Sequence, residues 1–347
     1  MVSFPDPRAS HPYHMHDMIL GQPEFIRATQ DRVREADVRR FLGRPRRIIV
    51  TGCGTSYHAA TYGARVLQSS LGARPAVHAI HAYDLLRDPA AAGDTVLAVS
   101  HSGNTPTTNR ALRRAKARGA RALALSGLPG TPMERIATST LVIGSTHDRS
   151  WANTMSYTTQ LAAFAGLALL ASEGSRGRSA WRSLPSLVAK ALETEAAIRA
   201  LAAAVAERDR VTFVGSDLDE VTALEAALKI RETCSLPASG YHLEQLLHGP
   251  FLSLDKREAV VALLDAGDGA RAAAILRGWR AAGAYVVTVG PGRDVPVPRT
   301  DRLIRPILSV VPMQFLAYYA AIERGANPDI MRTDVPRFQE GVGLLFT

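Results

Sequence analysis

Cysteine is scarce in this chain of 347 residues, which contains only Cys53 and Cys234. Two isolated cysteines provide neither a disulfide framework nor the paired spacing of a zinc site. The composition therefore predicts a protein of a reducing compartment, and we expect a cytoplasmic location.

Long apolar runs are missing as well. The best candidate, residues 161–171, is much shorter than the roughly 20 residues that a membrane-spanning helix needs. The N-terminus is polar and contains histidines, without the basic and then apolar order of a secretory signal. We therefore expect neither a membrane segment nor export.

Aromatic residues make up only 6% of the chain, and they are not interleaved with the arginines that dominate its net charge of +9. These arginines are scattered over expected helix faces, as at Arg110, Arg113, Arg114 and Arg118. Nucleic-acid binding usually needs a basic cluster with stacking aromatics or a recognisable module. The sequence favours a solvated, arginine-rich surface instead. A positive field would also steer small anionic ligands toward a cleft.

Apolar segments of strand length alternate with amphipathic segments of helix length, which indicates parallel sheets with crossover helices. We expect strands near residues 47–51, 75–80, 95–100, 121–126 and 140–144, and a long helix at about 153–173. The Gly/Ser/Arg-rich stretch 172–179 interrupts this pattern, and an Ala/Glu-rich helix over about 184–207 then leads to a second α/β unit.

The second unit repeats the first at a nearly constant offset. Gly52 corresponds to Gly215, Val96 to Ala259 and Gly127 to Gly290. Internal repetition at a fixed offset is typical of a duplicated domain.

Two loops of the first unit carry hydroxyl and glycine residues between a strand and a helix. They are Thr51–Ser56 and Ser100–Thr105. Backbone N–H groups, hydroxyls and a helix N-terminus converge in such a loop, so it predicts a phosphate site. In the second unit Thr55-Ser56 becomes Leu218-Asp219, and the other loop becomes residues 263–268 without hydroxyls. The anion site is therefore expected in the first unit alone.

The second unit contains acid/base groups instead. Glu225, Lys229 and Glu232 share one face of an expected helix, and His248 precedes Gly249-Pro250 at the end of another. Spacing alone favours a surface salt-bridge stripe for the first three residues and a structural cap for His248.

The order of these motifs resembles the sugar isomerase (SIS) domain family. The residues that carry the resemblance are Cys53–His58, Ser100–Thr105, the Glu225–Glu232 helix and His248–Pro250, together with residues 14–23 and 152–161. The similarity covers nearly the whole chain and is greatest to the isomerase half of glucosamine-6-phosphate synthase. It implies two tandem SIS domains, each a flavodoxin-like three-layer sandwich with a parallel sheet. The expected parts are a helical segment (1–40), SIS domain 1 (41–180), SIS domain 2 (181–330) and a tail (331–347).

The resemblance also implies a site. In the family pattern Glu232 would move a proton between C1 and C2, and His248 would open the sugar ring. Lys229 and Glu225 would support the hydroxyls and tune the site. The residues that would hold the phosphosugar are Thr55, Ser56, Ser100, His101, Ser102, Thr105 and Asn153. The histidine commonly comes from a neighbouring subunit in the family, which implies a homodimer with shared sites. No cofactor or metal is expected.

Two departures separate the chain from the synthase. The residues before the isomerase-like segment leave no room for a glutaminase domain, so glutamine-derived ammonia would need a separate glutaminase partner. The tail 334–342 has Gly341 where the synthase has its imine-forming lysine, and the lysines of this chain are Lys116, Lys190, Lys229 and Lys256. Covalent imine formation through the tail is therefore not expected.

Several activities remain compatible with these residues. The leading interpretation is an isomerase or deaminase of an amino sugar 6-phosphate or a ketose 6-phosphate, acting by proton transfer at C1/C2. The alternatives are a fructosamine 6-phosphate deglycase, an aminotransferase with a separate ammonia source, and a non-catalytic phosphosugar-binding regulator.

The remaining polar residues of the tail and the N-terminus are less specific. Arg332 and Arg337 could bind a phosphate or carboxylate, and Glu340 could add an acid/base group, or the tail could be solvated. The spacing of His11, His14 and His16 fits no single helix face, which disfavours a metal site.

Overall fold

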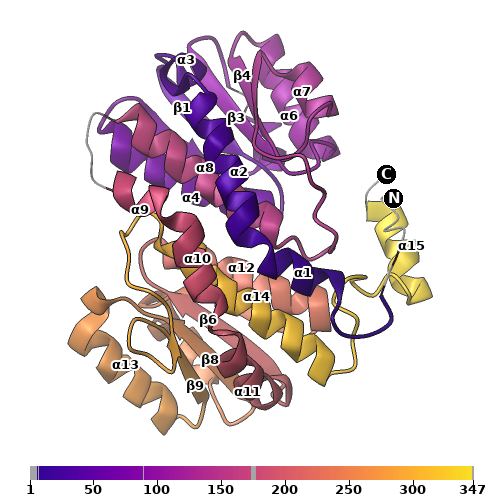
Figure 1. The fold of residues 1–347 in the computed structure, drawn as a ribbon, viewed down its shortest axis with the longest axis vertical. Coiled ribbons are helices and arrows are strands. Elements are labelled where there is room, and N and C mark those ends of the chain that lie inside the picture. Colours follow the sequence, from indigo (N-terminus) through magenta and orange to yellow (C-terminus); the bar gives the residue numbers. More distant parts are fainter. Residues whose placement is uncertain (1–5, 7, 89, 173–176, 346–347) are drawn as a thin grey trace.

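The computed structural model describes residues 6, 8–88, 90–172 and 177–345, and Figure 1 shows two α/β halves stacked one above the other. Each half contains one five-stranded parallel sheet. Helices cover both faces of each sheet, as buried parallel strands require.

The first sheet has the strand order β2-β1-β3-β4-β5. Its strands match the expected ones closely: β1 (Arg47–Thr51), β2 (Ala76–Ala79), β3 (Asp94–Ser100), β4 (Arg121–Ser126) and β5 (Ser139–Val142). Its helices are α4 (Thr55–Leu71), α5 (Ala82–Leu85), α6 (Pro106–Ala117), α7 (Pro132–Ile136) and α8 (Met155–Ala171). Every residue of β3 is buried, which explains its continuous apolar run.

The second sheet repeats this order as β7-β6-β8-β9-β10. Its strands are β6 (Arg210–Gly215), β7 (Ala238–His242), β8 (Glu258–Leu263), β9 (Tyr285–Gly290) and β10 (Val295–Pro296). Its helical elements are α12 (Asp219–Cys234), η1 (Gln245–Leu247), η2 (Pro250–Ser253), η3 (Ala266–Asp268), α13 (Gly269–Ala281) and α14 (Arg305–Glu323). The shared order is that of a flavodoxin-like sheet, so the predicted fold class is confirmed.

The duplication extends to the first strand–helix turn of each half. A side chain at Gly52 would lie 2.8 Å from the carbonyl oxygen of Ser56, and one at Gly215 would lie 2.3 Å from that of Asp219. Both turns therefore need glycine because the helix backbone passes directly over it.

The offset between the halves is less regular than the sequence predicted. In the first sheet Ile49 lies opposite Val96, whereas the corresponding Thr212 lies opposite Val260. Val260, and not Ala259, is thus the structural counterpart of Val96. A slip of one residue leaves the apolar pattern intact here because both central strands are buried on both faces.

The Ala/Glu-rich segment forms two helices and not the single one predicted. α9 (Arg178–Arg182) is followed by α10 (Leu184–Leu192) and α11 (Glu195–Ala206). The break is at Thr194, whose buried hydroxyl donates to the carbonyl of Ala191 at 2.6 Å. A hydroxyl that bonds to a nearby carbonyl competes with the backbone hydrogen bonds that would continue the helix. The alanine-rich composition around Thr194 favours a helix throughout, so the sequence pattern did not predict the break.

The N-terminal helices extend from the junction of the two halves along the first half, and the first of them packs against α14. They are α1 (His14–Leu20), α2 (Gln22–Glu35) and α3 (Val38–Leu42), and α2 packs against α8 (Figure 1). The Asp329 carboxylate accepts the backbone N–H groups of His14 and Met15, each at 2.8 Å. This contact fixes the start of α1 against the chain that follows α14.

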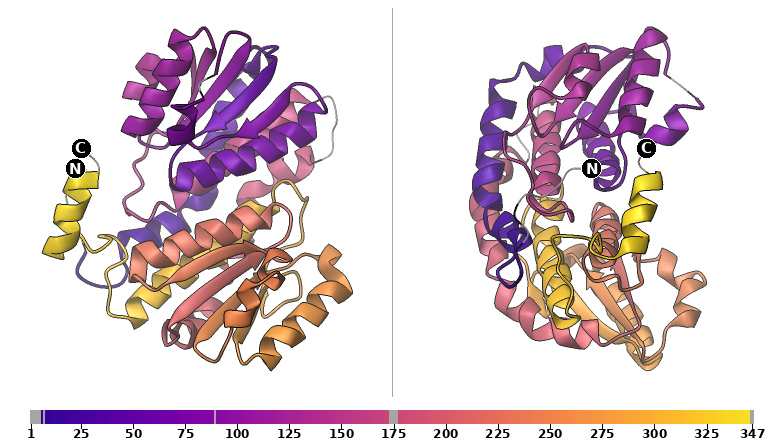
Figure 2. Two further views of the ribbon diagram at one scale, coloured as in Figure 1. Left: turned by 180° about the vertical axis from the view of Figure 1, so that it is seen from behind. Right: turned by 90° about the vertical axis from the view of Figure 1, so that its right-hand side faces the viewer.

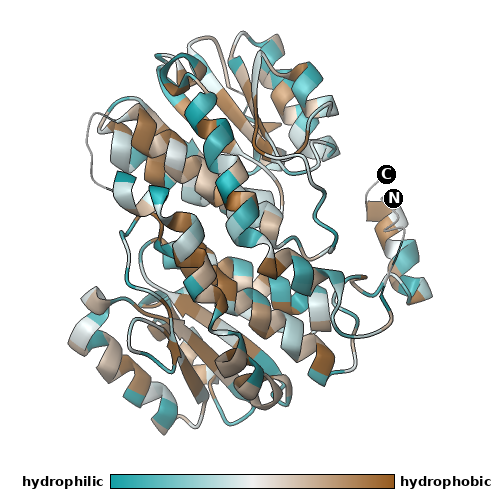
Figure 3. Cartoon of the chain, in the orientation of Figure 1, coloured by the Kyte–Doolittle hydropathy of each residue, from teal (hydrophilic) through white to brown (hydrophobic). Residues whose placement is uncertain are grey.

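Four helices form the junction between the halves: α4 and α8 from the first, and α12 and α14 from the second (Figures 1 and 2). Nearly all residues of α8 and α14 are buried, and both helices contain many hydrophobic residues (Figure 3). Neither helix is a membrane span: within the described residues, no helix combines the length and apolarity needed to cross a bilayer. The position of α12 against α4 brings the acid/base residues of one half to the loops of the other.

Candidate active site

The Ser100–Thr105 loop turns sharply after β3 and is held by its own side chains. The backbone N–H of Gly103 donates to the Ser100 hydroxyl at 3.0 Å, and that of Asn104 donates to the Ser102 hydroxyl at 3.3 Å. Gly103 has a φ of +63°, and a side chain there would lie 2.4 Å from Thr131. Only glycine fits this close turn, which directs the loop toward the N-terminus of α6.

The loop faces a cavity of about 300 Å³. The helices α4 and α6 both begin at its wall, so their positive dipole ends favour an anion there. The predicted residues that line this cavity are Thr55, Ser56, Ser100, His101, Ser102, Thr105, Asn153 and Glu232. The structure therefore brings together all the predicted phosphosugar-binding residues and the predicted base.

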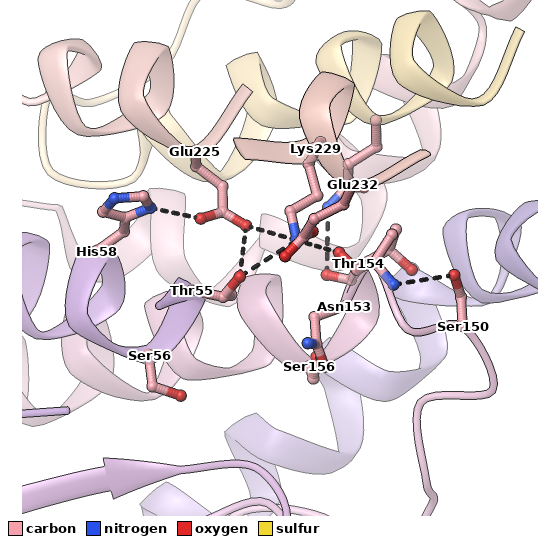
Figure 4. A network of polar contacts seen from close by, with 12 residues as sticks. Thr55, Ser56, His58, Ser150, Asn153, Thr154, Ser156, Glu225, Lys229 and Glu232 are labelled. Atoms are coloured by element: carbon pink, nitrogen blue, oxygen red, sulfur yellow. Dashed lines mark hydrogen bonds and ion pairs between the residues drawn. The ribbon is translucent and has the colours of Figure 1, made fainter. Parts of the chain in front are cut away.

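The three acid/base residues of α12 form one connected network (Figure 4). The Lys229 ammonium lies 2.5 Å from Glu232 Oε2 and 3.3 Å from Glu225 Oε1. Lys229 and Glu225 are fully buried, whereas the Glu232 side chain remains 15% exposed and reaches the cavity. A surface salt-bridge stripe is thus excluded, because two of its three members have no contact with solvent.

The network gives its two carboxyl groups different proton affinities. Burial opposes ionisation of Glu225, but Lys229 and the hydrogen bond from His58 outweigh it and lower the pKa of that carboxyl. Burial raises the pKa of Glu232 to about 7, although Lys229 opposes the shift. Burial also disfavours the Lys229 ammonium, but Glu225 and Glu232 keep its pKa above the usual value. Glu232 is therefore the group that can exchange a proton near neutral pH.

Thr55 serves this network more directly than it serves a ligand. Its hydroxyl donates to Glu225 Oε1 at 3.0 Å and accepts from the Lys229 ammonium at 3.2 Å. Lys229 also donates to the carbonyl of Ala152, which ties the loop before α8 to α12. Ser56, the next residue, has its hydroxyl at the cavity, where it accepts from the amide of Gln160 at 3.3 Å.

His248 lies apart from these residues. It is exposed after η1 and is absent from the lining of the cavity. Within one chain, therefore, the structure does not bring the predicted ring-opening histidine to Glu232.

Two residues that the sequence analysis did not assign belong to the site. The Nδ1 atom of His58 lies 2.6 Å from Glu225 Oε2, so α4 holds the buried carboxylate from the other side (Figure 4). The carboxylate of Asp148 accepts from the backbone N–H groups of Thr154 at 2.7 Å and Ser156 at 3.1 Å. Asp148 thereby caps the start of α8 and holds Asn153, whose φ is +49°, at the cavity.

In the second half, carboxylates occupy the position that corresponds to the anion site of the first half. Asp219 is the counterpart of Ser56, and its fully buried carboxylate forms an ion pair with Arg305 from α14. Asp265 lies 3.4 Å from the same guanidinium. The two carboxylates outnumber this single guanidinium, so a phosphate would meet net repulsion there.

The N-terminal histidines have separate hydrogen-bond partners. His16 lies 2.6 Å from Glu195, His11 lies 2.7 Å from the Tyr318 hydroxyl, and His14 lies 2.6 Å from the carbonyl of Asp6. Across the described residues, no group of three or more His, Cys, Asp and Glu side chains is placed to hold a metal ion.

Comparison with known proteins gives one family and consistent relatives. Residues 41–170 match the SIS domain family. The chain is 35% identical over 305 residues to a glutamine–fructose-6-phosphate aminotransferase (isomerizing) of Symbiobacterium thermophilum, covering 82% of this chain and 50% of that protein. The chain thus spans about half the length of the relatives it matches in sequence.

Two solved structures share the fold over almost their whole length. The C-terminal domain of glucosamine-fructose-6-phosphate aminotransferase from Francisella tularensis superimposes with a TM-score of 0.84 at 21% identity, covering 93% of this chain and 99% of that domain. A glucosamine-6-phosphate deaminase from Thermotoga maritima gives a TM-score of 0.78 at 21% identity, covering 91% and 97%. At 21% identity the two structures support the fold alone, and the reaction has to be inferred from the residues of the site.

Proposed function

This chain is a SIS domain protein with two SIS halves, and on that premise we propose that it is an isomerase or deaminase of a hexose or hexosamine 6-phosphate. The Ser100–Thr105 loop and the start of α4 bind the phosphate. Glu232 transfers a proton between C1 and C2 of the open-chain sugar. The named relatives act on, or are named for, sugar 6-phosphates, which supports this substrate class.

The chemistry follows from where the charges lie. A carboxylate that lines the cavity removes a proton from carbon next to a carbonyl and returns it to the neighbouring carbon. In a ketose phosphate this step yields the aldose. In a 2-amino aldose phosphate it yields a C2 imine, which water hydrolyses to the ketose and ammonia. Lys229 and Glu225 are buried behind Glu232, so they set its charge and position without touching the sugar.

One observation carries this proposal: Glu232, a carboxyl group with a pKa of about 7, lines the same cavity as the phosphate loop. We expect the purified protein to exchange solvent deuterium into C1 or C2 of fructose 6-phosphate or glucosamine 6-phosphate. Nuclear magnetic resonance detects the label, and an ammonia assay separates deamination from isomerisation.

The unphosphorylated sugars are the matched control for that exchange. Fructose and glucosamine have the same reacting carbons but lack the anion that the loop binds, so we expect them to stay unlabelled. Binding of sugar phosphates without any label would refute the enzymatic proposal and favour the phosphosugar-binding regulator.

The rate should rise with pH because the base must be ionised. We expect kcat for the exchange to increase from pH 5.5 to 8.5 with a midpoint close to 7, the pKa of Glu232. The substrate phosphate ionises near pH 6, so saturating substrate is used to separate binding from proton transfer. A kcat that is constant over this range would mean that Glu232 is not the base.

We further propose a homodimer in which His248 reaches the site of the partner. His248 is exposed after η1, and the neighbouring η2 exposes Leu252 (78%) and Phe251 (38%). A second copy of the chain would cover this apolar surface.

An aminotransferase activity that receives ammonia from a glutaminase partner is a further candidate. Ammonia-dependent formation of glucosamine 6-phosphate would reveal it.

A further inference from the structure

Glu232 lines a second cavity besides the one that contains the phosphate loop. This distal compartment measures about 470 Å³ and lies between the end of α12 and the tail. Its lining residues are Arg231, Glu232, Ser235, Leu236, Pro237, Met331, Arg332 and Phe338. Glu232 is the residue common to both linings, so the distal compartment begins at the residue that we propose acts on the sugar.

The distal compartment is positively charged. Arg231 and Arg332 face it, and Glu232 is the single acidic residue among its lining. Within the described part of the chain, neither arginine has a carboxylate at ion-pair distance, whereas Arg65, Arg302 and Arg305 each have one. Glu232 is already paired with Lys229 at 2.5 Å, so it does not neutralise the two guanidinium groups.

Arg332 is held in place by the tail. Its guanidinium carbon lies 4.0 Å from the centre of the Phe338 ring, the geometry of a cation–π contact. A guanidinium that stacks on a ring keeps its N–H edge available for two parallel bonds to a carboxylate. Leu236, Pro237 and Met331 add an apolar wall beside it.

We propose that the distal compartment receives a carboxylate-bearing substituent attached to the reacting end of the phosphosugar, with the carboxylate on Arg332 and Arg231. The apolar wall suits the short carbon chain that joins this carboxylate to the sugar. The inference rests on the proposed function, since it takes the phosphate to lie in the Ser100–Thr105 loop and the reacting carbon at Glu232. It makes the substrate a two-ended anion, with a phosphate at one end and a carboxylate at the other.

The test uses open-chain analogues that cannot react because they lack a carbonyl group. Reductive amination of glucose 6-phosphate with glycine gives a glucitol 6-phosphate that carries a carboxymethylamino group on C1, and glycinamide gives the matched neutral amide. Isothermal calorimetry with the full chain measures both dissociation constants. We expect the carboxylate analogue to bind about 10- to 100-fold more tightly, as for a charge-assisted pair that replaces a neutral contact.

Substitution locates this preference. Arg332→Ala should abolish it while leaving the affinity for the amide analogue unchanged, which also shows that the variant is folded. Arg337→Ala is the matched control, because Arg337 lies 5.2 Å from the same ring but does not line the compartment. Equal affinities in the unaltered protein, or a preference that survives combined Arg332→Ala and Arg231→Gln substitution, would overturn the inference.

Unsubstituted glucitol 6-phosphate separates the two proposals. If it binds without any added preference for the carboxylate, the phosphosugar site stands and the distal compartment is not a carboxylate site. If none of the three analogues binds, the proposed function fails together with the inference.

Discussion

Replacing Glu232 with glutamine should reduce deuterium exchange into the sugar phosphate by about 100- to 10,000-fold, the range that a general base contributes. Glutamine keeps the shape of the side chain but cannot accept the proton. It also keeps the cavity wall, so the affinity for glucitol 6-phosphate should change little. The rate is measured as label incorporated per minute, and the affinity by calorimetry.

A surface glutamate is the control for this substitution. The Glu244 side chain is 43% exposed, is paired with Arg271 and lies outside the cavity, so Glu244→Gln should retain the exchange rate of the unaltered protein. If Glu232→Gln retained that rate as well, the proton would have to be carried by another group, and the assignment of the base would be wrong.

The strands and the anion loop could be predicted because local chemistry determines them. Buried parallel strands give continuous apolar runs, and the turn at Gly103 has space for no other residue. Hydroxyl residues between a strand and a helix are a local signal, so Ser100–Thr105 could be recognised without its surroundings. The same reasoning recognised the duplication through Gly52 and Gly215.

The acid/base network could not be derived from local pattern, because its partners are far apart in the sequence. The i, i+4, i+7 spacing of Glu225, Lys229 and Glu232 indicated a shared face but gave no sign of what covered it. The buried state depends on Thr55 and His58 from the other half. A histidine one turn after the start of α4 has no local feature that marks it as the partner of a carboxylate on α12.

Asp148 shows the same limit at shorter range. Its carboxylate caps the start of α8 from a position outside the helix, across a loop that includes a residue with positive φ. Capping residues next to a helix are visible in a sequence, but one that lies several residues before it is not.

The tail presents the opposite case, because the sequence already indicated Arg332 as a candidate anion ligand. The structure adds the Phe338 ring on which its guanidinium stacks and the distal compartment that it lines.

The second large effect concerns stability. Lys229→Met removes the cation that Glu225 and Glu232 share. Glu232 and the carbonyl of Ala152 lose their buried donor, whereas Glu225 keeps its contacts with Thr55 and His58. Breaking a buried ion pair from one side costs about 3–5 kcal/mol of the free energy of unfolding. Urea denaturation at pH 8 measures this loss.

The pH dependence distinguishes unpaired charge from a simple packing defect. In Lys229→Met the ammonium no longer opposes the effect of burial on Glu232, so the pKa of this carboxyl in the folded chain lies even further above its unfolded value of about 4.3. The folded state then binds more protons, so the variant should lose stability as pH rises from 6 to 8 and regain part of it as pH falls. Adding Glu225→Gln to Lys229→Met removes one of the two charges, and it should therefore restore part of the stability at pH 8 and weaken its pH dependence. A loss that was equal at pH 6 and pH 8, and unaffected by Glu225→Gln, would contradict the charge argument and would assign the lower stability to altered packing around the methionine.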